Sequence, residues 1–174
     1  MNFRADHFSL FGLSPGFRLD SGDLDARYRH IQAKVHPDRF ANGSDAERRL
    51  SMQWATHANE AYLTLKKPLA RARYLLHLAG HDIQAENNTA MPAAFLIEQM
   101  TWREAVIEAR SAGDHHELER LHHRLQGDID ERFVELARLF DENDHAQATD
   151  CVRRLMFLEK LFNEIDDALA SLED

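Results

Sequence analysis

Three consecutive residues, His36-Pro37-Asp38, bring an imidazole, a rigid ring and a carboxylate together at one point of the chain. The imidazole can donate a hydrogen bond from one nitrogen while it accepts at the other, and the carboxylate can pair with a cation. His36 and Asp38 could therefore serve as a general base and the residue that orients it. However, the sequence places no serine or cysteine nucleophile beside them, and no glycine-rich phosphate loop follows a strand. We therefore expect no enzyme activity from this turn.

Histidines elsewhere in the chain raise the question of a metal site. His115-His116 and His122-His123 lie seven residues apart, which is about 10 Å along a helix axis and too far for one ion. His77 and His81 have the helical spacing of four, but Gly80, a typical helix stop, lies between them. A single cysteine can form neither an internal disulfide nor a thiolate site for zinc. We therefore predict no metal and no cofactor.

The tripeptide is expected to connect two facing helices. The first covers about 21–36 and ends before Pro37, because the residue that precedes a proline resists the α conformation. The second covers about 44–66 and opens with the capping box Ser-Asp-Ala-Glu at Ser44. Between them, residues 38–43 are predicted to be a loop, with a turn at Asn42-Gly43. The apolar stripes are Leu24, Tyr28, Ile31 and Val35 on the first helix, and Leu50, Trp54, Ala58, Ala61 and Leu65 on the second.

This arrangement resembles the J-domain across nearly all of residues 6–66. The matching runs are Leu24-x-x-x-Tyr28-Arg29-x-Ile31-x-x-Lys34-Val35, His36-Pro37-Asp38-Arg39-Phe40 and Asn59-Glu60-Ala61-Tyr62-x-x-Leu65. In that family, the turn and the basic surface beside it dock onto the ATPase domain of a 70-kDa heat-shock-type chaperone and stimulate hydrolysis. The alternative is a structural turn in which His36 and Asp38 only cap helices. The resemblance implies a chaperone-binding site formed by Arg27, Arg29, Lys34, His36, Pro37, Asp38 and Arg39.

The remaining predicted elements are helices as well. A short helix covers about 6–13, and another covers 68–80, at the junction between two regions. Three helices follow a polar stretch: the first opens at Pro92, and Asp114 and Asp144 are predicted to cap the other two. The apolar stripe of the last helix is Cys151, Leu155, Leu158, Phe162, Ile165 and Leu169.

The chain is predicted to hold two domains. Residues 81–91 are polar and lack periodicity, so we place a linker there. The predicted fold class is all-α: a J-domain over 1–80 that includes the junction helix, and an antiparallel three-helix bundle over 92–174. Residues 1–80 carry 12 basic and 8 acidic residues, a net charge of +4, whereas 81–174 carry 9 and 22, a net charge of −13. This asymmetry indicates two surfaces with different partners, with solubility alone as the alternative.

Composition also argues against several partners. The acidic second half disfavours nucleic acid, because phosphate binding needs clustered Lys and Arg. No stretch approaches 18 uninterrupted apolar residues, so we expect no contact with a membrane. The N-terminal sequence lacks the apolar run of a signal peptide, and the low cysteine content fits a reducing compartment. The expected location is the cytoplasm.

The predicted helix after Pro92 has two apolar faces. The first face consists of Phe95, Trp102, Val106 and Ala109, and the second of Leu96, Met100 and Ile107, continued by Ile97, Glu104 and Glu108. One face suffices for packing in a three-helix bundle, and the larger aromatics mark the first as the core side. The second face would then be partly exposed, with apolar residues rimmed by carboxylates, as in a binding site. The alternative is that a wide core buries both faces.

Two runs in the second half resemble the C-terminal domain of the HscB family, the J-type co-chaperones of iron–sulfur cluster assembly. The runs are Ala94-Phe95-Leu96-Ile97-Glu98-Gln99-Met100-x-x-Arg103-Glu104 and Val152-Arg153-Arg154-Leu155-x-Phe157-Leu158-Glu159-Lys160-Leu161. In that family the bundle binds the cluster scaffold, IscU, through an apolar and acidic patch. Thr101 stands where the bacterial form carries an acid, so the charge here is thinner. The implied scaffold-binding residues are Leu96, Ile97, Met100, Glu104, Glu108 and Phe157, the last as an exposed anchor off the core stripe.

The resemblance implies that this chain is a delivery protein. Its bundle would hold the scaffold while the J-domain presents His36-Pro37-Asp38 to an HscA-like chaperone, whose ATP hydrolysis promotes cluster transfer. The chain itself would hold no cluster, because one cysteine cannot supply the thiolate ligands. One alternative is a general J-domain co-chaperone for unfolded chains, although the Gly/Phe-rich or zinc-binding segments usual in that class are missing. Another is a helical adaptor without a chaperone role.

Overall fold

The computed structural model describes residues 5–40, 43–81, 83 and 93–173, and all regular structure within these ranges is helical. The chain divides into two compact units, Met1–Leu78 and Ala79–Asp174. The predicted turn residue Asn42, the helix-opening Pro92 and the predicted linker, apart from His81 and Ile83, lie outside the described residues.

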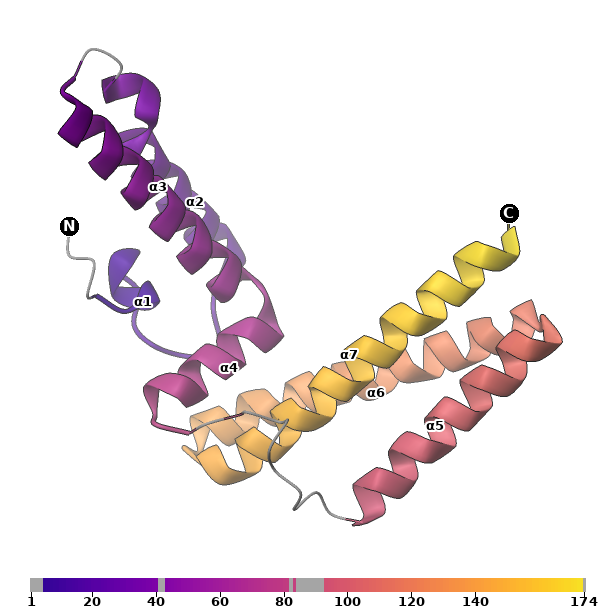
Figure 1. Ribbon diagram of the computed structural model, residues 1–174. Coiled ribbons are helices and arrows are strands. Elements are labelled where there is room, and N and C mark those ends of the chain that lie inside the picture. Colours follow the sequence, from indigo (N-terminus) through magenta and orange to yellow (C-terminus); the bar gives the residue numbers. More distant parts are fainter. Residues whose placement is uncertain (1–4, 41–42, 82, 84–92, 174) are drawn as a thin grey trace. The chain divides into compact units, whose positions relative to one another are not determined.

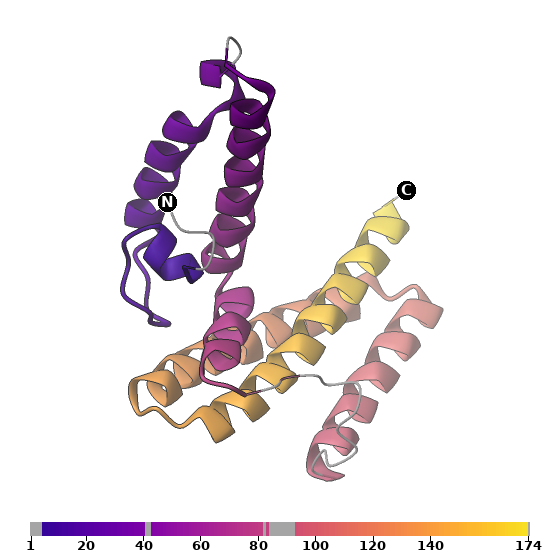
Figure 2. The same ribbon diagram turned by 60° about the vertical axis from the view of Figure 1, so that its left-hand side comes forward.

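The first unit is built on a helical hairpin. Helices α2 (Ser21–Val35) and α3 (Asp45–Lys66) lie side by side, and the short α1 (His7–Leu10) and α4 (Pro68–Leu78) complete the unit (Figures 1 and 2). Asp20 caps α2, since its carboxylate accepts from the backbone N–H groups of Gly22 and Asp23. The predicted capping box of α3 is confirmed, with Ser44 and Glu47 each satisfying the other's backbone donor.

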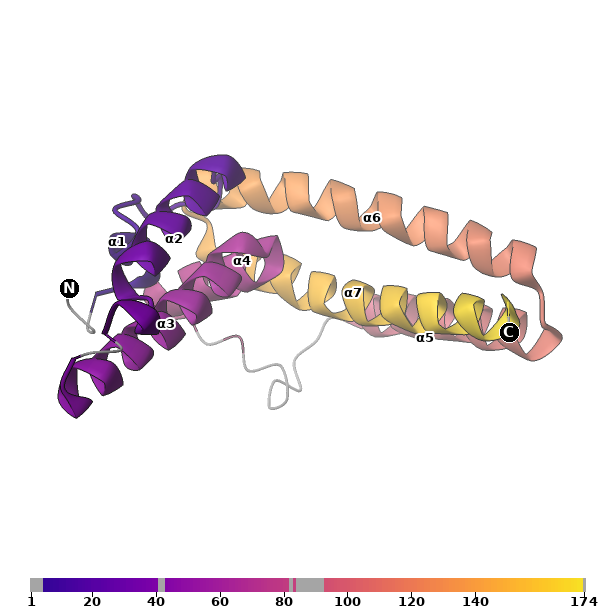
Figure 3. The ribbon, with the colours of Figure 1, turned by 90° about the horizontal axis from the view of Figure 1, so that it is seen from above.

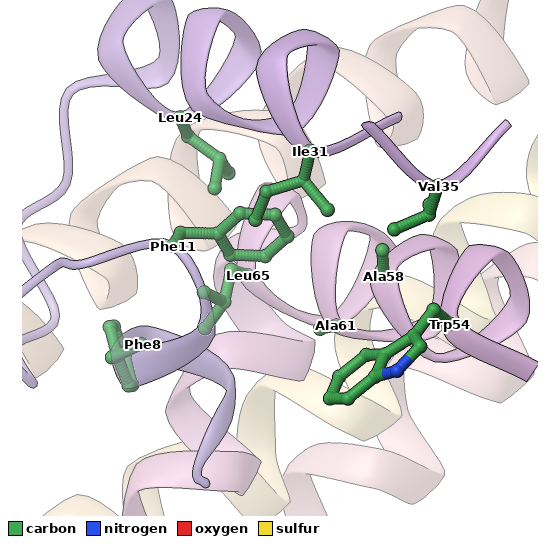
Figure 4. Packing of buried hydrophobic residues seen from close by; sticks show 9 residues of the cluster. All are labelled: Phe8, Phe11, Leu24, Ile31, Val35, Trp54, Ala58, Ala61 and Leu65. Atoms are coloured by element: carbon green, nitrogen blue, oxygen red, sulfur yellow. The ribbon is translucent and has the colours of Figure 1, made fainter. Parts of the chain in front are cut away.

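The core of this unit forms where α1, α2 and α3 meet. Figure 4 shows its side chains pointing toward one another from these elements. The predicted stripes are confirmed except at Tyr28, which is half-buried, and at Leu50, which is 47% exposed. Ser51 takes the buried position instead of Leu50, because 51, 54, 58, 61 and 65 keep the alternating spacing of three and four that one helix face requires. The buried cluster comprises Phe8, Phe11, Leu24, Ile31, Val35, Trp54, Ala58, Ala61 and Leu65.

The predicted loop after the tripeptide is wrong in its first part. Residues Pro37–Phe40 form a 3-10 helix, η1, in which the N–H of Arg39 donates to the carbonyl of His36 at 3.0 Å. Proline suits the first position of such a turn, because its fixed φ is already helical and its missing N–H is not needed there. The motif is therefore held in a defined turn directly after α2.

The second unit is an antiparallel bundle of α5 (Ala93–Ala112), α6 (His115–Asp141) and α7 (His145–Glu173), which run along one another (Figure 3). The carboxylates of Asp114 and Asp144 accept from the N–H groups of Glu117 and Gln147, both at 3.0 Å, so both predicted caps are confirmed. The turns before these caps need left-handed residues, and Gly113 (φ 62°) and Asn143 (φ 56°) supply them.

The buried face of α7 is wider than the predicted stripe. Phe162 and Leu169 are only half-buried, whereas Val152 and Leu161 are buried. The reason is that α7 packs against both α5 and α6, so that its contact surface spans more than one row of side chains. Among the described residues, no helix has both the length and the apolarity to cross a membrane.

Candidate functional site

The tripeptide forms an exposed polar turn at the end of α2. His36 is the C-cap, with φ −60° and ψ 129°, the extended backbone expected before a proline. The N–H of Asp38 donates to His36 Nδ1 at 3.3 Å, and Asp38 Oδ2 lies 3.6 Å from the same nitrogen. A ring nitrogen that accepts carries no proton, so in the neutral imidazole the proton is on Nε2. The side chains of His36 and Asp38 are 58% and 91% exposed, which suits contact with a partner.

Two side chains fix the end of α2, which presents the turn. The Ser51 hydroxyl, buried on α3, donates to the carbonyl of Val35 at 2.6 Å, and Arg39 Nη1 donates to the carbonyl of Ala33 at 3.1 Å. Both carbonyls belong to the last turn of the helix, where no intrahelical donor is left for them. Sequence reasoning missed Ser51, although a serine on the apolar stripe of α3 is a signal for a buried hydrogen bond.

The predicted basic surface is not one continuous patch. Arg29 and Lys34 are exposed but lie about 140° apart around the axis of α2 at 100° per residue. The guanidinium of Arg27 is engaged within the unit: Nε contacts Asp23 at 2.9 Å, and Nη1 donates to the carbonyls of Phe11 and Gly12, each at 2.9 Å. Arg27 thus ties the α1 turn to α2 and has fewer donors left for a partner.

A polar network joins the far end of α2 to α3. The rings of Tyr28 and Tyr62 stack with centroids 4.1 Å apart, and the Tyr62 hydroxyl donates to Asp25 at 3.0 Å. Lys66 Nζ also donates to the Asp25 carboxylate, at 2.7 and 2.9 Å, and this contact lowers the pKa of Asp25 and raises the pKa of Lys66. The network therefore links α2 and α3 at the end opposite the turn.

Helix α5 presents its two apolar faces as predicted. Phe95, Trp102, Val106 and Ala109 are buried, whereas Leu96, Ile97, Met100 and Ile107 are 48–64% exposed. The alternative of a wide core that buries both faces is therefore wrong. Glu104 and Glu108 are exposed on the same arc. We call Leu96, Ile97, Met100, Glu104 and Glu108 the α5 patch.

Thr101 adds no charge and little hydrogen-bonding capacity beside this patch. Its hydroxyl donates to the carbonyl of Ile97, one turn earlier in the same helix, at 3.0 Å. This back-bonding uses the only donor of the side chain. The acidic part of the patch is therefore limited to Glu104 and Glu108, as the sequence indicated.

Phe157 is not the exposed anchor that was predicted. It is half-buried, with its ring edge-on to Phe95 at 5.9 Å and the guanidinium of Arg103 5.6 Å from its centroid. The cause is that this side of α7 packs against α5, so the ring forms a wall between the core and the α5 patch. Arg103 was not singled out from the sequence as a site residue. Its place at the edge of the apolar arc on a helical projection is the signal that could have found it.

Two of the histidines considered for metal binding lie beside single carboxylates. His122 Nε2 lies 2.9 Å from Asp166, and His115 Nδ1 lies 3.7 Å from Glu119. Within the described ranges, no three side chains of His, Cys, Asp or Glu gather around a common point. Burial raises the pKa of the Cys151 thiol to about 11, which disfavours the thiolate that binds metals and attacks electrophiles.

Both units of the chain are similar to known proteins. Residues 91–166 match the family model described as the HSCB C-terminal oligomerisation domain. The chain is 56% identical to a co-chaperone protein HscB homolog of Aromatoleum aromaticum, over 99% of this chain and 98% of the other. Two solved structures superpose over nearly the whole chain: the chaperone HscB from Vibrio cholerae, with a TM-score of 0.85, 33% identity and coverage of 97% and 99%, and human HscB, with a TM-score of 0.90, 29% identity and coverage of 95% and 83%.

These matches settle the fold class and the family. The structure is all-α, with a J-like domain followed by a helical bundle, as the sequence predicted. The sequence identity of 56% over nearly the full length also places the chain with the HscB co-chaperones. The chain belongs to the HscB family of co-chaperones.

Proposed function

We propose that this protein delivers an iron–sulfur scaffold protein of the IscU type to a specialised 70-kDa heat-shock-type chaperone of the HscA type and stimulates its ATPase. The observation that supports this most directly is that one chain carries both an exposed His36-Asp38 turn on a helical hairpin and an exposed apolar arc on a separate bundle. The role assigned to the chain is to bring two partners together so that ATP hydrolysis promotes cluster transfer.

The chaperone-binding site is assigned to the N-terminal unit. The turn offers a ring N–H from His36 and a carboxylate from Asp38, while Pro37 restricts the backbone. Arg29 and Lys34 supply exposed positive charge on two sides of α2 and steer an acidic partner. We assign Arg39 a dual role, since it also holds the end of α2, and Arg27 a mainly structural one.

The scaffold-binding site is assigned to the α5 patch, with Phe157 as its half-buried wall. Fully burying a Leu, Ile or Met side chain is worth about 1.5–3 kcal/mol, and because these three are 48–64% exposed, each can contribute roughly half of that to the core of an interface. Glu104 and Glu108 form a charged rim, and the net charge of −13 over residues 81–174 favours a basic partner. We therefore assign scaffold binding to residues 92–174 and chaperone binding to residues 1–80. The proposed place of action is the cytoplasm.

The decisive experiment measures the ATPase rate of an HscA-type chaperone with this protein, with and without the scaffold. We expect stimulation by the protein alone, and a larger effect when scaffold is added. An unfolded, carboxymethylated protein should not replace the scaffold. Equal synergy with the unfolded protein would instead support a general co-chaperone, and a basal rate in every mixture would refute a chaperone role.

A further inference from the structure

A groove between α5 and α7 lies directly beyond the α5 patch. It encloses about 300 Å³, and Val106, Ile107 and Leu161 form its apolar part. Val106 and Leu161 are buried and make the floor, whereas Ile107 stands at the mouth with 62% of its surface exposed. An isoleucine so exposed, on a helix whose other face fills the core, contributes little to the packing of the unit.

Ile107 continues the apolar row of the α5 patch. It follows Leu96 by 11 residues and Met100 by 7, which places it within about 20° of both around the helix axis at 100° per residue. Arg103 connects the patch with the groove. Its guanidinium lies over the ring of Phe157, and the same side chain lines the groove. The patch and the groove therefore form one continuous surface.

Charges around the groove indicate what kind of partner fits. Arg103 and Arg110 line the α5 side, and Glu164 and Asp167 line the α7 side. An apolar side chain in this groove would thus enter between a basic rim, which suits carbonyl or carboxylate oxygens, and an acidic rim, which suits Lys or Arg. A second copy of this chain would bring another unit with a net charge of −13, and that repulsion disfavours self-association.

We propose that the groove at Ile107 is a second anchor site for the same iron–sulfur scaffold, taking an apolar side chain of the scaffold from a segment that carries both charge signs. This inference rests on the proposed function and adds to it. Binding then involves a row of contacts that runs from Leu96 past Met100 to Ile107, with Arg103 and Arg110 as residues that determine specificity. The surface is longer than the α5 patch alone.

The test is calorimetric titration of the scaffold into the full-length protein and three variants. Ile107→Glu places a charge in the groove and should raise the dissociation constant about tenfold. One large apolar anchor commonly contributes the binding free energy that corresponds to such a change. Leu96→Ala tests the α5 patch. Val134→Glu is the matched control, because Val134 is 72% exposed on α6 and outside the surface, and it should change the constant less than twofold. Circular dichroism and scaffold-independent ATPase stimulation should be unchanged in all three.

The outcomes separate the two proposals. If Leu96→Ala weakens binding and Ile107→Glu does not, the groove is not an anchor and the proposed function stands. If the wild-type protein does not bind the scaffold at all, the proposed function fails. Sedimentation tests whether a second copy of this chain occupies the groove instead. If the protein is a dimer that Ile107→Glu dissociates, and scaffold affinity is unchanged, the groove serves self-association and the inference is overturned.

Discussion

The two units present their candidate sites in opposite ways. In the first unit the site is a polar turn outside the main helices, and its backbone is held by a buried hydrogen bond from Ser51 and an exposed one from Arg39. In the second unit the site is apolar and lies on one face of an uninterrupted helix, α5, on which Leu96 and Met100 are both exposed.

This difference determines how each site should respond to substitution. A turn acts through the geometry of a few donors and acceptors, so that losing one of them removes most of its effect. An apolar face acts through the summed area that it buries, so that each truncated side chain removes a share. Changes in the first site should therefore be nearly all-or-none, and changes in the second should be graded.

The largest effect is expected from His36→Gln. The amide of glutamine cannot reproduce the ring nitrogens in their places, so ATPase stimulation of the partner chaperone should fall to the basal rate. Scaffold affinity and helicity should be unchanged, because His36 is exposed and lies outside the core. Steady-state ATPase assays and circular dichroism make the measurement.

His116→Gln is the matched control, since its side chain is 94% exposed on α6, far from the turn in sequence. It should stimulate like the wild type. Substantial stimulation by His36→Gln would show that the turn is not all-or-none and would remove the contrast between the two sites.

Leu96→Ala should give the next largest effect, a roughly tenfold weaker dissociation constant for the scaffold, because it removes most of one exposed Leu side chain from the interface. Leu96→Ala with Met100→Ala should weaken binding further than either alone. Val134→Ala on α6 serves as the control and should be silent. Complete loss from the single Leu96 truncation, with helicity intact, would contradict the graded behaviour.

Much of this picture was predictable from the sequence because its signals are local or periodic. The capping box at Ser44 and the proline after His36 mark the ends of helices, and the family motifs around the turn indicate the J-like domain. The two faces of α5 follow from spacing alone: a helix in a three-helix bundle has room to bury one face, so the face with Phe95 and Trp102 was expected inside.

The missed features depend on which side chains meet across helices. Periodicity placed Phe157 off the core stripe of α7, but it could not show that this side of α7 packs against α5 and lies under Arg103. It also placed Leu50 on the buried stripe of α3. Leu50 and Ser51 are neighbours that differ by only about 100° around the helix axis, so spacing alone did not show which of them is buried. Hydrophobicity favoured the leucine, whereas the buried carbonyl of Val35 required the serine.

Ser51→Ala tests whether buried hydrogen bonds hold the first site. It leaves the carbonyl of Val35 buried without its donor and should lower the stability of the first unit by about 1–3 kcal/mol. Thr101→Ala removes the equivalent side-chain-to-backbone bond at an exposed position of the second unit and should cost less than about 0.5 kcal/mol. Amide hydrogen exchange measures the stability of each unit separately, in α2 and α3 for the first unit and in α5 for the second. Equal effects would mean that burial does not distinguish the two sites.

A smaller effect is expected from His7, which lies at the edge of the core of the first unit. Its ring stacks on Tyr74 at 4.2 Å and meets His57 edge-on at 5.8 Å, and its Nδ1 is buried without a hydrogen-bond partner. Burial, followed by the nearby His57, lowers the pKa of His7, while Asp6 and Glu60 act in the opposite direction. In the unfolded chain the imidazole regains a pKa of about 6.5, so the unfolded state binds more protons as the pH falls.

The stability that neutral His7 contributes is thus complete above about pH 6.5 and is lost as the pH falls below it. We expect amide exchange in α1 and α3 to show a lower opening free energy at pH 5.5 than at pH 7.5, after correction for the intrinsic exchange rate. His7→Phe keeps the stacked ring and should reduce this difference, whereas the exposed His116→Phe should not. Carboxylates with lowered pKa values, such as Asp6 and Asp25, titrate below this window and do not contribute. An unchanged pH difference in His7→Phe would show that His7 does not make the first unit sensitive to acid.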